Sequence, residues 1–366
     1  MSVDRAGELP AGPIVGASRT CGTVPVPLLA LIILVASAGC SSSAESPAKP
    51  ADAASRPAPV PLAAPLPADA APPASETGGF DGARAFDHVA KLVAFGPRPA
   101  GSAALGRAQE YIKGQLRGFG CGVDEDSFTA QTPVGPIAMK NIVAKVPGQA
   151  KEIILLLTHY DTLHLDNFVG ANDAGSSSGV MLEMARLYCG TRPEKRLAGA
   201  SLWIALVDGE EAQVVVNGVA QWSDTDSVYG SRELAARMAL GGELPRVKAV
   251  VLADMIGDRN LHLKRDGNST PWLVDLVWNT AKRLGYGNHF LDEPLPMQDD
   301  HIPFTRRHVP AVDLIDFESS DTFWHTPQDT LDKVSARSLA IIGHVLVESL
   351  PQIEKRPRAE AGPAAR

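Results

Sequence analysis

Short apolar stretches recur along the chain from residue 80 onward, and each is about as long as a buried strand. They are rich in Val, Ile and Leu and show no polar alternation, which is typical of strands covered on both faces. Five such stretches are expected to form strands: residues 141–146, 152–158, 201–207, 247–253 and 311–315.

Amphipathic stretches lie between these strands. Residues 179–188, 231–240 and 271–284 repeat apolar positions at spacings of three and four, as helices do. One helix is expected near residues 83–116 and a closing helix near 335–350. Because strands that alternate with helices form sheets covered on both faces, the pattern predicts an α/β fold. We expect a single three-layer α/β/α sandwich with a mixed, mainly parallel central sheet.

The first 79 residues have a different composition from the rest. Residues 24–39 are apolar but short for a membrane span, and they suit the hydrophobic region of a secretory signal. They end in Ser-Ala-Gly-Cys, which resembles a bacterial lipobox with Cys40 as the lipid-bearing residue. Residues 41–79 are mostly Ala, Pro and Ser, so they cannot bury enough surface to offset their ordering entropy.

These features divide the chain into four segments. We expect a signal peptide over 1–39, a disordered tether over 40–79, a folded domain over 80–355 and a disordered tail over 356–366. The protein is then exported and held by a lipid at the cell envelope, on a periplasmic or outer face. Two cysteines, Cys121 and Cys189, fall in the folded domain, where a disulfide and two free thiols are equally compatible with the sequence.

Charge excludes one class of partner. The 366 residues carry a formal net charge of -8, and no long Lys/Arg cluster offsets it. A nucleic-acid binder usually needs a basic face, so we expect no nucleic-acid partner.

Acidic and imidazole side chains follow successive predicted strands. His159, the pair Glu210–Glu211 and Asp254 come at the ends of three of them. Asp173 lies in the loop after His159, and His325 follows the last strand. Singly, each has an ordinary structural interpretation, such as a helix cap or a core imidazole. Together they predict a site, because ligands of α/β sheets bind beyond the carboxyl ends of the strands.

The residue types at this edge suit a zinc ion. Zinc takes imidazole and carboxylate ligands, and a catalytic site leaves one position open. Asp173, Glu211 and His325 would supply three ligands, with Glu210 as a neighbouring base. His159 and Asp254 would either complete a second zinc site that shares Asp173 or orient the ligands of the first, and the sequence leaves this open.

The order of these residues resembles the zinc aminopeptidase family M28. Finer strings resemble its cyclising branch, the glutaminyl-peptide cyclotransferases of animal type. Six strings carry the resemblance and span nearly all of residues 85–350: 158–161, 168–171, 208–212, 226–232, 299–304 and 324–326.

The resemblance implies roles for individual residues. It places one zinc on Asp173, Glu211 and His325, and it makes Glu210 the acid–base residue. It links Asp254 and Asp299 to Glu210 by hydrogen bonds. It also implies that the substrate-binding residues are Trp222, Gln298 and Trp324.

The implied reaction converts the N-terminal Gln of a peptide or protein to pyroglutamate and releases ammonia. Zinc would polarise the side-chain amide while Glu210 moves the proton. The alternative is an aminopeptidase with one or two zinc ions, which the small residues after Asp173 favour. The string at 299–304 favours the cyclase, which we expect. An inactive domain that only binds peptide termini is a lesser alternative, against which the intact Glu210 argues.

Overall fold

The computed structural model describes residues 69–190, 197–320 and 322–357. The predicted signal peptide, most of the predicted tether and nearly all of the predicted tail lie outside these residues. Residues 69–79, which we expected to be extended tether, instead contact the domain: Thr77 is fully buried and Asp69 pairs with Arg259. The ring of Phe80, which follows these residues directly, is also fully buried, and the Thr77 hydroxyl donates a hydrogen bond to the Phe80 carbonyl.

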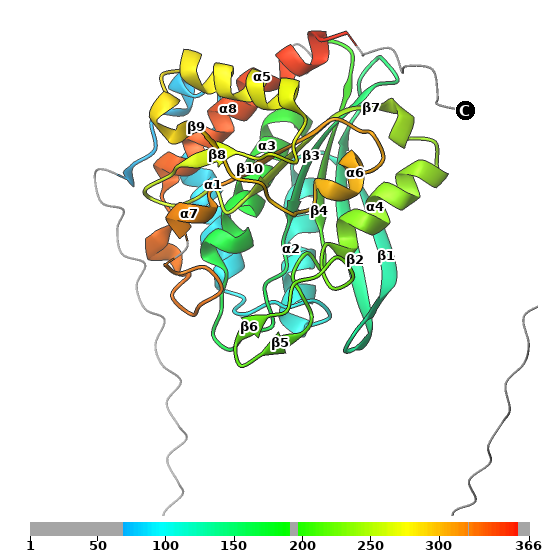
Figure 1. Ribbon diagram of the computed structural model, residues 1–366. Helices are drawn as coiled ribbons and strands as arrows, with labels where there is room; N and C mark the ends of the chain where they lie inside the picture. Colours follow the sequence, from blue (N-terminus) through cyan, green and yellow to red (C-terminus); the bar gives the residue numbers. More distant parts are fainter. Residues whose placement is uncertain (1–68, 191–196, 321, 358–366) are drawn as a thin grey trace, which may run out of the picture. The chain divides into compact units, whose positions relative to one another are not determined.

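A six-stranded sheet forms the centre of the domain (Figure 1). Its strands lie in the order β1-β2-β4-β3-β7-β10. Their bounds are β1 Gly122–Thr132, β2 Gly135–Val146, β3 Ile153–His159, β4 Ser201–Val207, β7 Val247–Asp254 and β10 Ala311–Ile315.

The sheet is mixed and mainly parallel, as predicted. Strands β4, β3, β7 and β10 run parallel to one another, whereas β1 and β2 pair antiparallel with their neighbours. The parallel strands are buried along almost their whole length, which is why they are visible as apolar stretches. Strand β1 was not predicted, because it is an edge strand with mostly polar, solvent-facing side chains.

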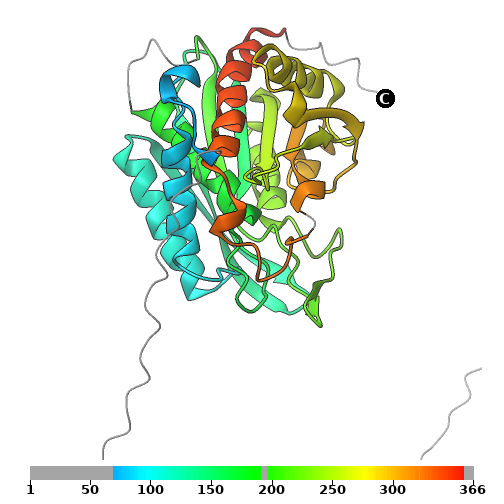
Figure 2. The same cartoon turned by 90° about the vertical axis from the view of Figure 1, so that its left-hand side faces the viewer.

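Two apolar clusters, one on each face, make the sandwich three layers thick. On one face, Ile154 and Leu156 of β3 pack in a cluster with residues of α1, α2, α3, α5 and α8. On the other face, Leu155 and Leu157 pack with residues of α4 and with Phe304 of α6. Figure 1 shows α4 near β4 and α6 near α4, and Figure 2 shows α8, in red, beside α1, in blue. The alternation of side chains along each strand therefore builds both cores.

The helices close both faces of the sheet. Their bounds are α1 Gly82–Val93, α2 Ala103–Gly118, α3 Ser177–Cys189, α4 Tyr229–Leu240, α5 Pro271–Arg283, α6 Ile302–Thr305, α7 Phe317–Ser320 and α8 Ala336–Lys355. The single opening helix expected near 83–116 was wrong: it is two helices. Pro97 and Pro99 cannot continue a helix, and Gly96 between the helices has a φ of 81°. Ser102 then caps α2 by accepting a hydrogen bond from the Leu105 backbone.

Smaller elements lie outside the central sheet. Within the described residues they are the hairpin strands β5 Val215–Val216 and β6 Val219–Ala220, the paired strands β8 Leu263–Arg265 and β9 Phe290–Pro294, a π-helix at Ala171–Ser176, and 3-10 helices at Ala74–Glu76, Leu244–Arg246, Gly287–His289 and Leu331–Lys333. A disulfide joins Cys121 to Cys189, which decides between the two states that the sequence allowed. Across the described ranges, no helix is both long and apolar enough to span a bilayer.

Candidate active site

The carboxyl ends of three parallel strands deliver most of the predicted site residues. His159 is the last residue of β3 and Asp254 the last of β7. Glu210 and Glu211 follow the end of β4 by three and four residues. Since β4, β3 and β7 are adjacent and parallel, these side chains converge at one edge of the sheet.

A first group of ligand-type side chains contains Asp173, Glu211 and His325. Nε2 of His325 lies 3.1 Å from Oε2 of Glu211 and 3.4 Å from Oδ2 of Asp173. One candidate ligand atom from each residue lies within 4.8 Å of the others. His325 has a φ of 51°, in the left-handed region that non-glycine residues seldom occupy and that recurs at functional sites. The three residues predicted to share a metal ion are thus together.

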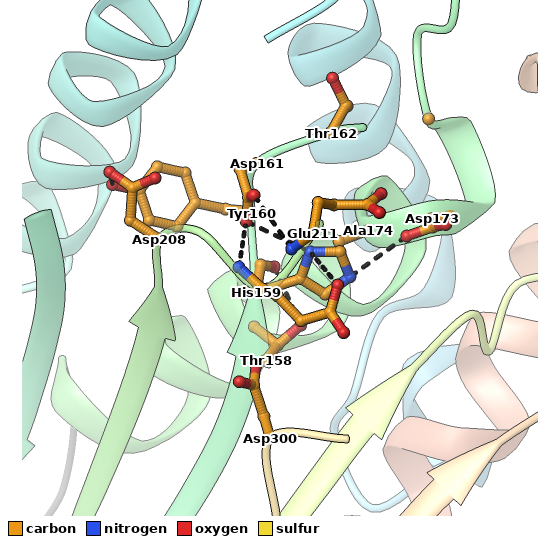
Figure 3. Close-up of polar contacts among 12 residues, drawn as sticks. Thr158, His159, Tyr160, Asp161, Thr162, Asp173, Ala174, Asp208, Glu211 and Asp300 are labelled. Carbon is orange, nitrogen blue, oxygen red and sulfur yellow. Dashed lines mark hydrogen bonds and ion pairs between the residues drawn. The ribbon is translucent and has the colours of Figure 1, made fainter. Parts of the chain in front are cut away.

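A second group contains His159, Asp173 and Asp254. Nε2 of His159 lies 3.1 Å from Oδ1 of Asp254 and 3.2 Å from Oδ1 of Asp173. Figure 3 shows the His159 ring directed toward Asp173. Asp173 is therefore common to both groups, with one carboxylate oxygen facing each imidazole. The structure keeps the residues for a second metal ion, and it is equally consistent with His159 orienting Asp173.

The turn after β4 holds the glutamate pair. Gly209 has a φ of 71°, and a Cβ there would lie 2.5 Å from the sulfur of Met139, so the turn requires glycine. The carboxylate of Asp161 accepts hydrogen bonds from the backbone N–H groups of Glu210 and Glu211, at 3.2 and 3.4 Å. Asp161 falls within the string 158–161 that carries the resemblance, but this positioning role was not predicted.

Arg98 is a second residue that the sequence did not reveal. Its guanidinium is fully buried and donates hydrogen bonds to the carbonyl oxygens of Tyr160, Val169 and Gly170, at 2.9, 2.6 and 3.0 Å. These carbonyls flank Asp161 and Asp173, so one side chain fixes both loops of the site. No local motif identifies such a residue, since its partners are backbone atoms of distant segments.

Asp329 holds the Asp173 loop from the other side. Its carboxylate oxygens accept hydrogen bonds from the backbone N–H groups of Asn172, at 2.7 Å, and Asp173, at 3.0 Å. Burial raises the pKa of Asp329 to about 7, although these two donors oppose the shift. This residue also lay outside the predicted set.

The electrostatics of the site separate the two neighbouring glutamates. Burial raises the pKa of Glu210 well above its ordinary value, and the Asp299 carboxylate adds to the effect against the opposing charge of His159. Burial also raises the pKa of Glu211, but the charge of His325 opposes this shift. Burial lowers the pKa of His325, yet Glu211 and Asp173 outweigh it and raise that pKa to about 10.

These groups fit a metal ion. The Oε2 atom of Glu211 is buried, and its contact with Nε2 of His325 at 3.1 Å does not have hydrogen-bond geometry, so within the part of the chain that the structure describes it accepts no hydrogen bond. A buried carboxylate oxygen without a donor is costly, and a cation would compensate it. The donor set of two imidazoles and three carboxylates suits zinc better than a purely oxygen-binding ion.

A cavity of about 250 Å³ opens over this site. Its walls include the catalytic and ligand candidates Asp173, Glu210, Asp254, Asp299 and His325. All three predicted substrate-binding residues, Trp222, Gln298 and Trp324, also line it. Trp324 stacks on His325 with ring centroids 4.0 Å apart. Every predicted site residue except Glu211 and His159 therefore lines the cavity, and those two contact residues that do.

The hydrogen bonds expected between Glu210 and the acids Asp254 and Asp299 stay a prediction. Asp254 contacts His159, and the Asp299 carboxylate accepts a hydrogen bond from the backbone of Asp300 at 2.5 Å. The influence of Asp299 on Glu210 in the structure is electrostatic.

Comparison with known proteins shows one family. Residues 141–350 match the model of peptidase family M28. The glutaminyl-peptide cyclotransferase of Bothrops jararaca is 33% identical over 290 residues, which cover 68% of this chain and 76% of that protein. The glutaminyl-peptide cyclotransferase of Drosophila melanogaster is 28% identical over 272 residues, covering 67% and 75%.

Solved structures agree with this assignment. An Acidobacteriales bacterium glutaminyl cyclase has a TM-score of 0.69 and 38% identity, covering 76% of this chain and 96% of its own. A Zn-dependent exopeptidase from Parabacteroides distasonis ATCC 8503 has a TM-score of 0.67 and 25% identity, covering 76% and 99%.

Proposed function

The chain belongs to peptidase family M28, and on this premise we propose that it is a zinc-dependent glutaminyl-peptide cyclotransferase. Its substrates are peptides and proteins with an N-terminal Gln, and its products are the pyroglutamyl peptide and ammonia. Relatives that carry the name glutaminyl-peptide cyclotransferase or glutaminyl cyclase match it in both sequence and structure, which supports the proposal.

One observation of the site carries the proposal. Glu210 stands outside both ligand groups, lines the cavity and has a raised pKa, while its neighbour Glu211 belongs to a ligand group. A carboxyl group whose pKa is raised is a suitable acid–base residue, because it can accept a proton and return it within one reaction. The cyclisation needs one such group, because the proton lost by the amine must reach the leaving nitrogen.

Asp173, Glu211 and His325 would hold the zinc ion. When bound, zinc acts as a Lewis acid toward the side-chain amide carbonyl of the substrate. The remaining work falls to the protein. Trp222 and Trp324 would confine the Gln side chain in the cavity, so that its own α-amine lies against the amide carbon.

Glu210 would transfer the proton in both halves of the reaction. It accepts the proton of the α-amine as the new carbon–nitrogen bond forms, and it returns that proton to the amide nitrogen as the old bond breaks. The leaving group is then neutral ammonia. Asp299 contributes by holding the pKa of Glu210 upward, since the two carboxyl groups repel each other's charge.

A second candidate function is an aminopeptidase of the same family. The complete group of His159, Asp173 and Asp254 favours it, because an enzyme with two metal ions would use that group. A solved relative with the name Zn-dependent exopeptidase also has this fold. Here Glu210 would take a proton from water instead of from the substrate amine.

One experiment separates the two activities. The zinc-loaded protein is incubated with a Gln-Xaa peptide and with a Leu-Xaa peptide of otherwise identical sequence, and the products are read by mass. Loss of ammonia from the first peptide supports the cyclase. Release of free Leu from the second supports the aminopeptidase, and no change in either supports a domain that only binds peptide termini.

We also propose that the protein is exported and anchored by a lipid on Cys40. The Cys121–Cys189 disulfide supports export, since structural disulfides persist in oxidising compartments. A Cys40→Ser variant should lose metabolic labelling by palmitate and leave the membrane fraction. Labelling that persists in this variant would contradict the anchor.

A further inference from the structure

A second cavity, of about 130 Å³, adjoins the site cavity. Three residues, Trp222, Gln298 and Asp299, line both, so the two cavities share one wall. The second cavity lies between the start of α4 and the segment formed by α6 and the residues after it, and Arg232, Arg306 and Arg307 line it. We refer to it as the arginine cavity.

The charges of two of these arginines are uncompensated. Arg306 pairs with Asp224 at 3.1 Å, and both side chains are exposed. Arg232 donates to the backbone carbonyl of Asp224 and lies over the ring of Tyr229, while Arg307 donates to the backbone carbonyl of Pro303. Within the described ranges, neither Arg232 nor Arg307 forms an ion pair with a carboxylate.

This concentration of positive charge contrasts with the rest of the molecule. The chain has a formal net charge of -8, so its average field repels acidic peptides. Three arginines and two acids, Asp224 and Asp299, line the arginine cavity. Guanidinium groups present planar arrays of donors that match a carboxylate better than any other common peptide group.

We propose that the arginine cavity is a subsite for a carboxylate carried by the substrate close to its N-terminus. The inference rests on the proposed function in one respect, that the substrate enters the site cavity by its N-terminal residue. The shared wall of Trp222, Gln298 and Asp299 makes the two cavities neighbours. Successive residues advance the chain by about 3.5 Å, so the side chain of the second or third residue reaches the next cavity. The preferred substrates then carry Asp or Glu at one of these positions.

The arginines of this cavity also have structural contacts. Arg306 forms an ion pair with Asp224 that joins the segment after Trp222 to the end of α6. Arg232 and Arg307 are therefore the better test positions, since neither side chain belongs to that ion pair. Arg84, an exposed residue on α1, supplies a matched control for the loss of one positive charge, because α1 packs on the opposite face of the sheet.

The experiment compares C-terminally amidated peptides with Glu or Gln at the second or third position after an N-terminal Gln. Binding is measured by calorimetry on the zinc-loaded Glu210→Gln variant, which should not convert them, and turnover is measured on the zinc-loaded wild type. We expect the Glu peptide to bind to the Glu210→Gln variant about fivefold more tightly than the Gln peptide, and to lose this advantage at high salt. In the wild type the two peptides should differ in KM and not in kcat. The C-terminus of a short peptide is a second source of a carboxylate near the N-terminus. A Gln-Xaa dipeptide with a free C-terminus is therefore compared with the same dipeptide amidated at its C-terminus.

Variants then assign the preference to the cavity. The double substitution Arg232→Gln/Arg307→Gln is introduced into the wild type and into the Glu210→Gln variant. The ratio of the affinities for the Glu and Gln peptides should then fall toward one, whereas Arg84→Gln should leave this ratio unchanged. Equal affinity for the two peptides, or a preference that survives the double substitution, overturns the subsite. Failure of the proposed function looks different: the wild type then releases no ammonia from either peptide, while the calorimetric ratio still decides the subsite.

Discussion

Nε2 of His325 lies 3.1 Å from Oε2 of Glu211, while Glu210, one residue earlier, belongs to neither ligand group. Two adjacent carboxylates at the end of one strand thus have different surroundings. Glu211 faces His325 and Asp173, whereas Glu210 lines the cavity, with Oε2 3.9 Å from Nδ1 of His159. This separation is the basis of the metal and proton roles proposed for the pair.

Substitution of Glu210 should remove chemistry and spare the metal. In Glu210→Gln the isosteric amide keeps the packing but cannot accept a proton, so turnover should fall by about 10²-fold or more. Zinc content, measured by elemental analysis after dialysis, should stay at the wild-type level. The matched variant Glu211→Gln should instead lose zinc. Turnover that survives Glu210→Gln would refute the proton role.

Arg98 should be among the most sensitive positions outside the ligands. Arg98→Met removes the donors to three carbonyls and leaves the nearby acids without their buried cation. The free energy of unfolding should decrease by about 3–5 kcal/mol. Urea unfolding measures it, with Arg107→Met on the exposed face of α2 as a control that should change stability by less than about 0.5 kcal/mol. Equal effects of the two variants would contradict this role.

The metal-free protein should lose stability as pH rises. The pKa of His325 is raised from 6.5 to about 10 by Glu211 and Asp173 against the effect of burial. Its contribution to stability is therefore complete below about pH 6.5 and disappears as pH rises through about 10. Buried carboxyl groups with a raised pKa, such as Glu210, act in the same direction.

Zinc should remove this part of the pH dependence, because a ligating His325 is neutral. The test is the urea midpoint between pH 6 and 10, measured with zinc and with a chelator. We expect the two curves to diverge as pH rises. Parallel curves would mean that His325 does not bind the metal.

The disulfide should contribute strongly to stability. Cys121 and Cys189 are separated by 68 residues, and closing a loop of that length in the unfolded chain is worth about 4 kcal/mol in the chain-entropy model. Cys121→Ser should therefore reduce the free energy of unfolding by about 4 kcal/mol. Dithiothreitol should destabilise the wild type but not the variant. A wild type that is insensitive to reductant would show that the bond is absent in solution.

Much of the fold could be predicted because its strands are buried on both faces. Strands such as β3 and β7 leave an uninterrupted apolar signal, so their existence and order were visible. Strand β1 has no such apolar run, since many of its side chains face solvent at the edge of the sheet. The opening helix was predicted too long because its apolar spacing resumes after Pro97 and Pro99, which interrupt it.

The candidate site was predictable where function requires a particular residue type. Metal-ligand types at strand ends and in the loops that follow them identified His159, Asp173 and Glu211 as members of one site, and the structure brings them together. Arg98 and Asp329 were not predictable, because they act through backbone atoms that only the fold brings near. Trp222, Gln298 and Trp324 were found by resemblance, since aromatic and amide residues alone do not indicate a pocket.

The most direct measurement uses a peptide whose N-terminal Gln carries ¹⁵N in its side-chain amide. The account predicts that the zinc-loaded protein releases ¹⁵N-ammonia and that the peptide becomes a pyroglutamyl peptide with no free α-amine. Release of intact labelled Gln, with a new free amine on the second residue, would contradict the cyclase and establish an aminopeptidase.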